Sequence, residues 1–224
     1  MCVQLVVNRK GKLLYEGGLD ITPERMCLTD RNTVAMVVGE DEIQMIQVKD
    51  KTLTRETVVT VGKHVCGITS SGNDLVVSYK KKPWLEKVSM DGTVLNQFDI
   101  RGNPKHFVSP FFMCTTPGGS VFISDNGTNK ITQVDASLNL LQTFTDPLLM
   151  KPYGITALTE DQILVCSRGN HSIVLLQPST NTVTTLLGKE DEICSPYSLT
   201  HCANQRKLYV TSRWTDTIKI YQTV

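Results

Sequence analysis

The chain has 224 residues, of which 40% are hydrophobic and 20% are charged, an ordinary balance for a folded globular protein. Its 23 basic and 22 acidic residues give a formal net charge of +1, which excludes a whole-molecule field that attracts nucleic acid or an anionic membrane. The first residues hold only a short apolar run before charges begin, so we expect no signal peptide, no membrane span and a cytoplasmic protein.

The seven cysteines are dispersed along the chain and include no C-x-x-C pair. This pattern predicts reduced, buried thiols, and it favours neither a zinc site nor a thioredoxin-like redox site.

Short runs rich in Val, Ile, Leu, Thr and Tyr recur between clusters of Gly, Asn, Asp, Ser and Pro, which is typical of an all-β fold. In chain order, equivalent second strands are expected at residues 34–39, 75–78, 121–124, 164–167 and 209–212. The last four of these end on serine, and the serines are 46, 43 and 45 residues apart. Such spacing is typical of the four-stranded blades of a β-propeller.

The repeats predict a single propeller domain of five blades, with a six-bladed ring as the alternative. The blade units are expected at about 20–62, 63–104, 105–148, 149–190 and 191–224. The chain ends after a third strand, so residues 1–19 are expected to supply closing strands that cover the edge of the last blade.

The run from Val121 to Asp135 resembles the NHL repeat, in which an apolar strand is followed by Asp, a short loop with Asn, a basic residue and Ile. Residues 167–173 and 212–218 are looser copies, and the Pro152-Tyr153-Gly154-Ile155 start of a first strand is also similar to that family. The resemblance implies the C-terminal recognition module of a tripartite-motif ubiquitin ligase. It implies binding of a protein partner or substrate, without catalysis in these residues.

Strands that alternate in direction bring the B–C and D–A loops of every blade to one face of a propeller, and the A–B and C–D loops to the other. The first set of loops is rich in basic and aromatic residues, and the second set is mostly acidic. Basic residues interleaved with aromatic ones suit an acidic peptide or single-stranded RNA, the second hypothesis for the partner; DNA is not expected. The predicted binding residues are Lys80, Lys81, Lys82, Trp84, Asn129, Lys130, Arg168, His171, Arg213, Trp214, His64, Lys105, His106, Phe111, Tyr153 and Tyr197.

Structural roles compete with binding at some of these positions. The tyrosines Tyr153 and Tyr197 are expected to pack between blades, whereas burial explains Trp84 and Trp214 less well. Asp125 is expected to cap its own loop through backbone hydrogen bonds.

An enzyme is the third hypothesis, as a metal-dependent lyase or lactonase with His, Asp or Glu side chains converging on the central channel. The sequence holds only four histidines and lacks H-E-x-x-H, G-x-S-x-G and phosphate-cradling glycine loops. We therefore predict no catalytic residues, no metal and no cofactor.

Overall fold

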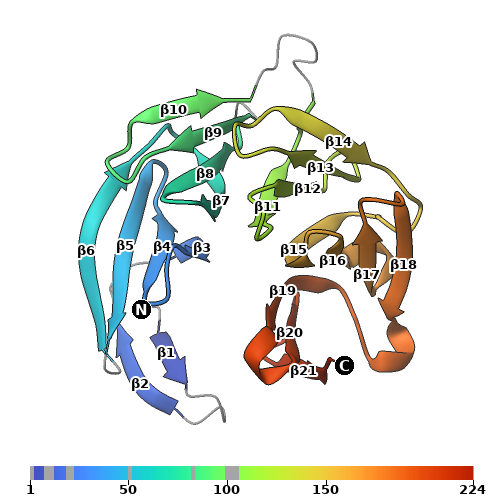
Figure 1. Ribbon diagram of the computed structural model, residues 1–224. Helices are drawn as coiled ribbons and strands as arrows, with labels where there is room; N and C mark the ends of the chain where they lie inside the picture. Colours follow the sequence, from blue (N-terminus) through green and yellow to red (C-terminus); the bar gives the residue numbers. More distant parts are fainter. Residues whose placement is uncertain are drawn as a thin grey trace.

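A computed structural model of the chain describes the strands at residues 3–7 and 13–18, and residues 23–49, 52–81, 84–98 and 106–223, with side chains from residue 24 onward. The described residues form 21 strands, of which 19 are arranged as five antiparallel blades around a centre, a five-bladed β-propeller (Figure 1). The all-β propeller fold predicted from the repeat is confirmed. No described helix is long and apolar enough to span a membrane.

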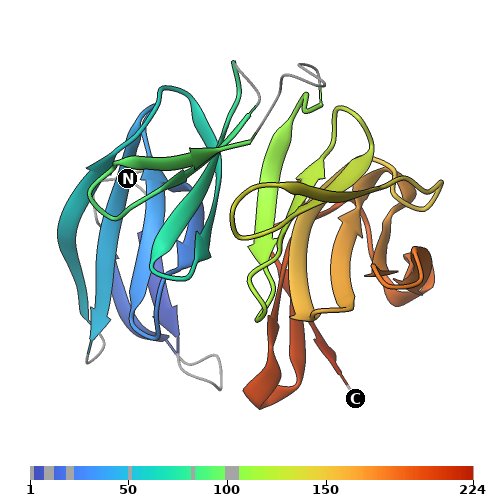
Figure 2. The same ribbon diagram turned by 45° about the horizontal axis from the view of Figure 1, so that its top comes forward.

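Each blade starts with its innermost strand. Blade 1 contains β3 (Pro23–Leu28), β4 (Thr33–Val38), β5 (Glu42–Lys49) and β6 (Thr52–Thr60). Blade 2 contains β7 (Val65–Ser71), β8 (Asp74–Tyr79), β9 (Leu85–Val88) and β10 (Val94–Gln97). Blade 3 contains β11 (Pro110–Thr115), β12 (Val121–Asp125), β13 (Lys130–Val134) and β14 (Leu140–Phe144). In Figures 1 and 2 the first strands of successive blades line the centre, and the fourth strands lie on the rim.

The last two blades differ in strand number. Blade 4 contains β15 (Pro152–Thr159), β16 (Gln162–Ser167), β17 (Ser172–Gln177) and β18 (Thr182–Leu187). Blade 5 contains only β19 (Pro196–Cys202), β20 (Lys207–Ser212) and β21 (Ile218–Gln222). Short 3₁₀ turns occur at Arg168–Asn170, Lys189–Asp191 and Ala203–Gln205.

The N-terminal hairpin of β1 (Val3–Val7) and β2 (Leu13–Gly18) forms a separate two-stranded sheet. In Figure 1 it lies at the bottom of the ring, between the first and last blades. We expected this segment to pair with the last blade, but among the described strands β21 pairs only with β20. The edge of blade 5 therefore carries no fourth strand here.

The hydrophobic core lies between neighbouring blades. Four buried clusters join blade 1 to 2, blade 2 to 3, blade 3 to 4 and blade 4 to 5. Among the described residues no such cluster joins blade 5 to blade 1. Consistent with this, Ile218 on β21 is 61% exposed, whereas its counterparts Leu85, Ile131 and Ile173 on the third strands of other blades are fully buried.

Serines of the repeat join neighbouring blades. Ser78 Oγ donates to the carbonyl of Pro110 at 2.5 Å, and Ser124 Oγ donates to the carbonyl of Tyr153 at 2.6 Å. Both serines are buried, and both acceptors lie on the first strand of the next blade. In blades 2 and 3 the serine that marks the repeat is thus a hydrogen-bond donor to the next blade, whereas Ser167 Oγ donates to the carbonyl of Met150.

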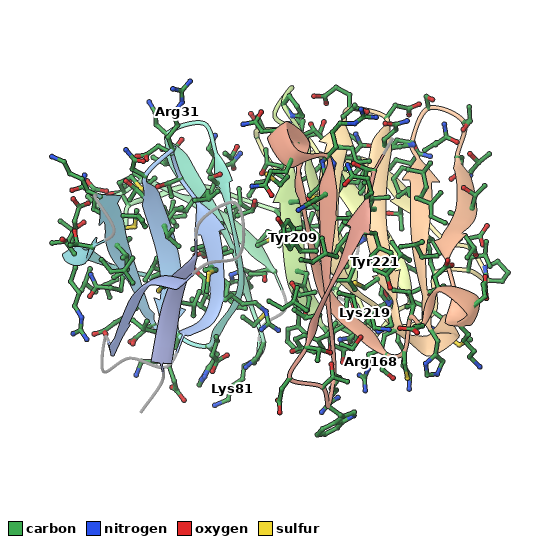
Figure 3. All side chains as sticks on the ribbon, turned by 90° about the horizontal axis from the view of Figure 1, so that it is seen from below. Arg31, Lys81, Arg168, Tyr209, Lys219 and Tyr221 are labelled. Atoms are coloured by element: carbon green, nitrogen blue, oxygen red, sulfur yellow. The ribbon has the colours of Figure 1, made fainter. Side chains whose placement is uncertain are left out.

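The loops separate into two faces as predicted. Figure 3 shows Arg31, in the loop between β3 and β4, at one end of the molecule, and Lys81 and Arg168, in loops between second and third strands, at the other. The acidic residues of the first face have structural partners. Asp30, Asp91 and Asp135 accept hydrogen bonds within their own turns, and these hold the pKa of each carboxyl below its usual value. The largest contribution comes from the backbone N–H of Asn32 for Asp30, from the Ser89 hydroxyl for Asp91 and from the Asn139 side chain for Asp135.

Candidate functional site

The first strand of every blade contains a β-bulge directly after its first residue. The pairing register with the second strand shifts after Pro23, Val65, Pro110, Pro152 and Pro196. A bulge bends the strand and re-aims a side chain, and it is frequent beside functional sites. Proline fits the start of such an edge strand because it has no N–H to donate to a ladder.

The five residues that follow these positions lie around the mouth of the central channel, on the face of the B–C loops. We call them the mouth ring: Glu24, Cys66, Phe111, Tyr153 and Tyr197. Together with Arg25, Lys80, Ser212 and Arg213 they line a cavity of about 410 Å³. This volume lies within the range of small-molecule sites. Every blade contributes to the ring, so the repeat itself builds the cavity.

Arg25 is the central cation of the mouth. Its Nη2 donates to Tyr197 Oη at 3.3 Å, its Nε donates to the carbonyl of Phe111 at 3.4 Å, and its Nη1 donates to the carbonyl of Glu24 at 2.6 Å. The guanidinium carbon lies 4.3 Å from the ring centroid of Phe112. A guanidinium has five N–H donors, and described groups accept from three nitrogens here, which leaves donors for a ligand.

Three aromatic rings from neighbouring blades meet below Arg25. The ring centroids of Phe112, Tyr153 and Tyr197 lie 5.9, 5.5 and 5.1 Å apart in the three pairings. Arg168 Nη1 donates to Tyr153 Oη at 3.0 Å. The close approach depends on Gly154, because a Cβ there would lie 2.7 Å from the Cα of Ser198 on the next blade.

Charge at the mouth is unbalanced. Arg25, Lys80 and Arg213 line the cavity together with the single carboxylate of Glu24. Lys80 Nζ lies 3.2 Å from Glu24 Oε2, and both side chains are about half exposed. The mouth therefore attracts anionic groups and holds one carboxylate able to accept a proton.

Cys66 is the remaining polarisable group of the mouth ring. Burial raises the pKa of its thiol to about 11, so the thiol is protonated at neutral pH. A thiol of this kind is a poor nucleophile. Among the described residues no three His, Cys, Asp or Glu side chains gather as metal ligands.

The cavity brings together five of the residues predicted from the sequence, Lys80, Phe111, Tyr153, Tyr197 and Arg213. Arg168 joins them through Tyr153. Arg213 also stacks on Trp214, which is 82% exposed, as expected for that tryptophan. The tyrosines do pack between blades, but they also line the cavity.

Other predicted residues lie away from the mouth. Trp84 is half-buried and packs on the core between blades 1 and 2, edge-on to Tyr79, so the expectation that burial would not explain it is wrong. His106 packs against Phe98 and lies edge-on to Phe107, and burial lowers its pKa. His64 lies 3.5 Å from Glu40.

Two further predicted residues link loops of neighbouring blades. Asn129 Oδ1 accepts the N–H of Lys151 at 2.8 Å, and His171 Nδ1 accepts that of Ser195 at 3.1 Å. Lys130 begins β13, and Lys81 is exposed in its loop. Lys82 and Lys105 lie outside the described residues.

Glu24, Arg25 and Phe112 were missed by sequence reasoning. The signal was present, because Pro23-Glu24-Arg25 stands where Pro152-Tyr153-Gly154 and Pro196-Tyr197-Ser198 stand in later blades. Blade 1 has Glu24 where the later blades have an aromatic residue, so its equivalence to them was not recognised.

No protein-family model and no curated protein sequence matches the chain. Solved structures do match. Virginiamycin B lyase from Staphylococcus aureus is 17% identical with a TM-score of 0.65, over 96% of this chain and 75% of that one. A streptogramin B lyase structure is 16% identical with a TM-score of 0.68, over 97% and 75% of the two chains.

A third match is a catalytically inactive histidine-to-alanine variant of the Staphylococcus aureus lyase with quinupristin, 17% identical with a TM-score of 0.63, over 96% and 75% of the two chains. At these identities the likeness shows a shared fold. The matched propellers are enzymes, which corrects two expectations, that the chain is the non-catalytic recognition module of a tripartite-motif ligase and that it is no enzyme.

Proposed function

We propose that this propeller is a lyase-type enzyme that acts on a small carbonyl-bearing molecule at the mouth ring. The observation that carries the proposal is the placement of Glu24, the one carboxylate among the described residues lining the mouth, beside the cations Arg25, Lys80 and Arg213. The likeness to lyase propellers supports the same class of chemistry.

A lyase cleaves by elimination, and an elimination next to a carbonyl needs a base and a group that stabilises negative charge on the carbonyl oxygen. In the proposed reaction Glu24 removes the proton from the carbon beside the carbonyl. The released electron pair forms a carbon–carbon double bond, and the bond to the leaving oxygen breaks. Arg25 and Arg213 stabilise the charge that develops on the carbonyl oxygen.

The leaving oxygen requires a proton source in the same cavity. Tyr197 Oη accepts a hydrogen bond from Arg25, so its own proton is free to point at the substrate. The ion pair of Lys80 with Glu24 lies at the surface. In the proposed reaction it breaks when an anionic group of the substrate binds Lys80, which leaves the Glu24 carboxylate free to act as the base.

No histidine is among the described residues lining the mouth, whereas a histidine-to-alanine variant of the Staphylococcus aureus lyase is catalytically inactive. In this chain we therefore assign the base to a carboxylate. This difference in the reacting group also favours a substrate that differs from that of the matched enzymes.

Comparison of Glu24→Gln with the wild-type protein tests the proposal. Quinupristin and a panel of simple β-acyloxy carbonyl compounds are incubated with each protein, and unsaturated products are measured by mass spectrometry. Loss of a general base lowers the rate by about a hundredfold or more. Glu56→Gln, an exposed glutamate on β6, is the matched control and keeps the rate. No unsaturated product from any substrate, or equal rates for Glu24→Gln and Glu56→Gln, would overturn the proposal.

A further inference from the structure

A second cavity continues from the mouth into the central channel. It has a volume of about 770 Å³ and shares Glu24, Arg25, Phe111 and Tyr197 with the mouth. First strands of all five blades line it. Along β3 its lining runs from Glu24 to Leu28, which at about 3.3 Å per residue gives a length of roughly 13 Å. The two cavities thus form one elongated space with Arg25 at their junction.

Apolar side chains line the inner part of this space. They include Met26, Leu28, Ile68, Ile155 and Leu199. Met26 is 58% exposed and Leu28 is 65% exposed, although both face the cavity, whereas Ile68, Ile155 and Leu199 are buried. Apolar area left open in this way gains free energy when a ligand covers it.

Two hydroxyl groups of the same lining are already hydrogen-bonded within the wall. Thr69 Oγ1 and Thr115 Oγ1 lie 3.2 Å apart, and Thr115 Oγ1 donates to the carbonyl of Ser70 at 2.5 Å. These threonines therefore need no polar partner from a ligand. The inner cavity offers mostly apolar contact beside the hydroxyl residues Ser70, Thr156, Ser198 and Thr200, while the positive charge lies at the mouth.

We propose that the ligand of this space is an amphipathic carboxylate, with its head group at Arg25, Lys80 and Arg213 and an unbranched aliphatic chain along the inner cavity. Charge complementarity fixes the orientation, because the cations lie at the mouth end and the open apolar side chains Met26 and Leu28 lie at the inner end. The inference rests on the proposed function for the location of the site, and it names the substrate class.

Equilibrium binding of a series of fatty acids tests this inference. Butanoate, octanoate, decanoate and dodecanoate are titrated by calorimetry below their micelle concentrations. Burial of each added methylene tightens binding by about fourfold. Dodecyltrimethylammonium, which has the same tail with a cationic head, binds much more weakly than dodecanoate. Affinity independent of chain length, or equal affinity for the two head groups, would overturn the inference.

Two variants distinguish the channel from a general hydrophobic surface. Leu28→Asp places a charge in the inner cavity and lowers affinity for dodecanoate by tenfold or more, with little effect on butanoate. Ile218→Asp is the matched control, because Ile218 is 61% exposed but does not line the cavity, and it keeps the affinity. Similar losses from both variants would overturn the inference. Both side chains are exposed, so neither change is expected to prevent folding.

The two proposals fail in different ways. If binding depends on chain length but no β-acyloxy carbonyl compound is turned over, the lyase proposal is wrong and the proposed ligand class is supported. If the protein catalyses elimination but shows no preference for a long-chain acid, the proposed ligand class is wrong and the lyase proposal is supported.

Discussion

Asp125 is the buried carboxylate on which the loops of blade 3 depend, and replacing it with alanine is the sharpest test of how the mouth is held. Its exposed fraction is 1%. Its oxygens accept N–H groups of Val108 at 2.6 Å, Ser109 at 3.0 Å, Gly127 at 2.9 Å and Thr128 at 3.2 Å. The first two donors belong to the segment that leads into Phe111 of the mouth ring, so one side chain joins two loops.

The expected cost follows from these four hydrogen bonds. A hydrogen bond to a charged group contributes about 1.5–3 kcal/mol, and a buried donor without an acceptor costs about 1–3 kcal/mol. We therefore expect Asp125→Ala to lower the free energy of unfolding by about 4 kcal/mol, equivalent to a Tm decrease of about 10 °C.

Asp135→Ala is the matched control. Asp135 also accepts three hydrogen bonds, from Ser137 N, Asn139 N and Asn139 Nδ2, but in an exposed turn. Water replaces these partners, so we expect a loss of about 1 kcal/mol. Urea denaturation followed by circular dichroism measures both variants. Equal losses for the two would refute the argument that burial makes Asp125 costly to remove.

Three further predictions concern packing and buried groups. Gly154→Ala places a Cβ 2.7 Å from the Cα of Ser198, so we expect a loss of about 3 kcal/mol in urea denaturation, and an unchanged midpoint would contradict the close approach of β15 and β19. Tyr79→Phe removes the 2.5 Å hydrogen bond to buried Glu86, so we expect the free energy of unfolding to fall by about 2 kcal/mol. Tyr209→Phe removes a hydrogen bond to Gln205 near the surface, and we expect a loss of under about 1 kcal/mol. A larger loss for Tyr209→Phe than for Tyr79→Phe would be evidence against the buried Tyr79 pair. Burial raises the pKa of Cys66 to about 11 and that of Cys166 well above 9.0, so between pH 9.0 and about 11 these thiols ionise mainly in the unfolded chain. Unfolding free energy should therefore fall by about 1.4 kcal/mol per pH unit per thiol in this window, and an unchanged slope in Cys166→Ala would contradict the burial of that thiol.

Much of the fold could be predicted because the residues that recur in the repeat each have one structural role. The serines at 78 and 124 donate across blades, and the prolines at 110, 152 and 196 start first strands, so both recur at fixed spacing. Pairing of the N-terminal hairpin could not be read in this way, because a strand pattern does not specify its partner.

The site was only partly predictable, for a related reason. Phe111, Tyr153 and Tyr197 follow prolines and are aromatic, so they stood out. Arg25 was not recognised because its role depends on Tyr197 and Phe112, which are far away in the sequence and adjacent only in the ring.

The function was predicted less accurately from the sequence than the fold was. The run around Asp125 resembles NHL repeats, yet its conspicuous aspartate is buried and binds backbone N–H groups. Trp84 was expected to be a binding residue because of its position in a predicted loop, but it packs against the core. Loop position alone does not distinguish a binding residue from one that closes its own loop.

The central claim is that the mouth ring eliminates and does not hydrolyse, and the fate of oxygen from water tests it most directly. A β-acyloxy carbonyl compound that the protein turns over is incubated with it in isotopically labelled water, and the products are analysed by mass spectrometry. Elimination yields an unsaturated carbonyl product and a carboxylate without oxygen from the solvent, and this is the result we expect. Solvent oxygen in the products, with no new double bond, would contradict it.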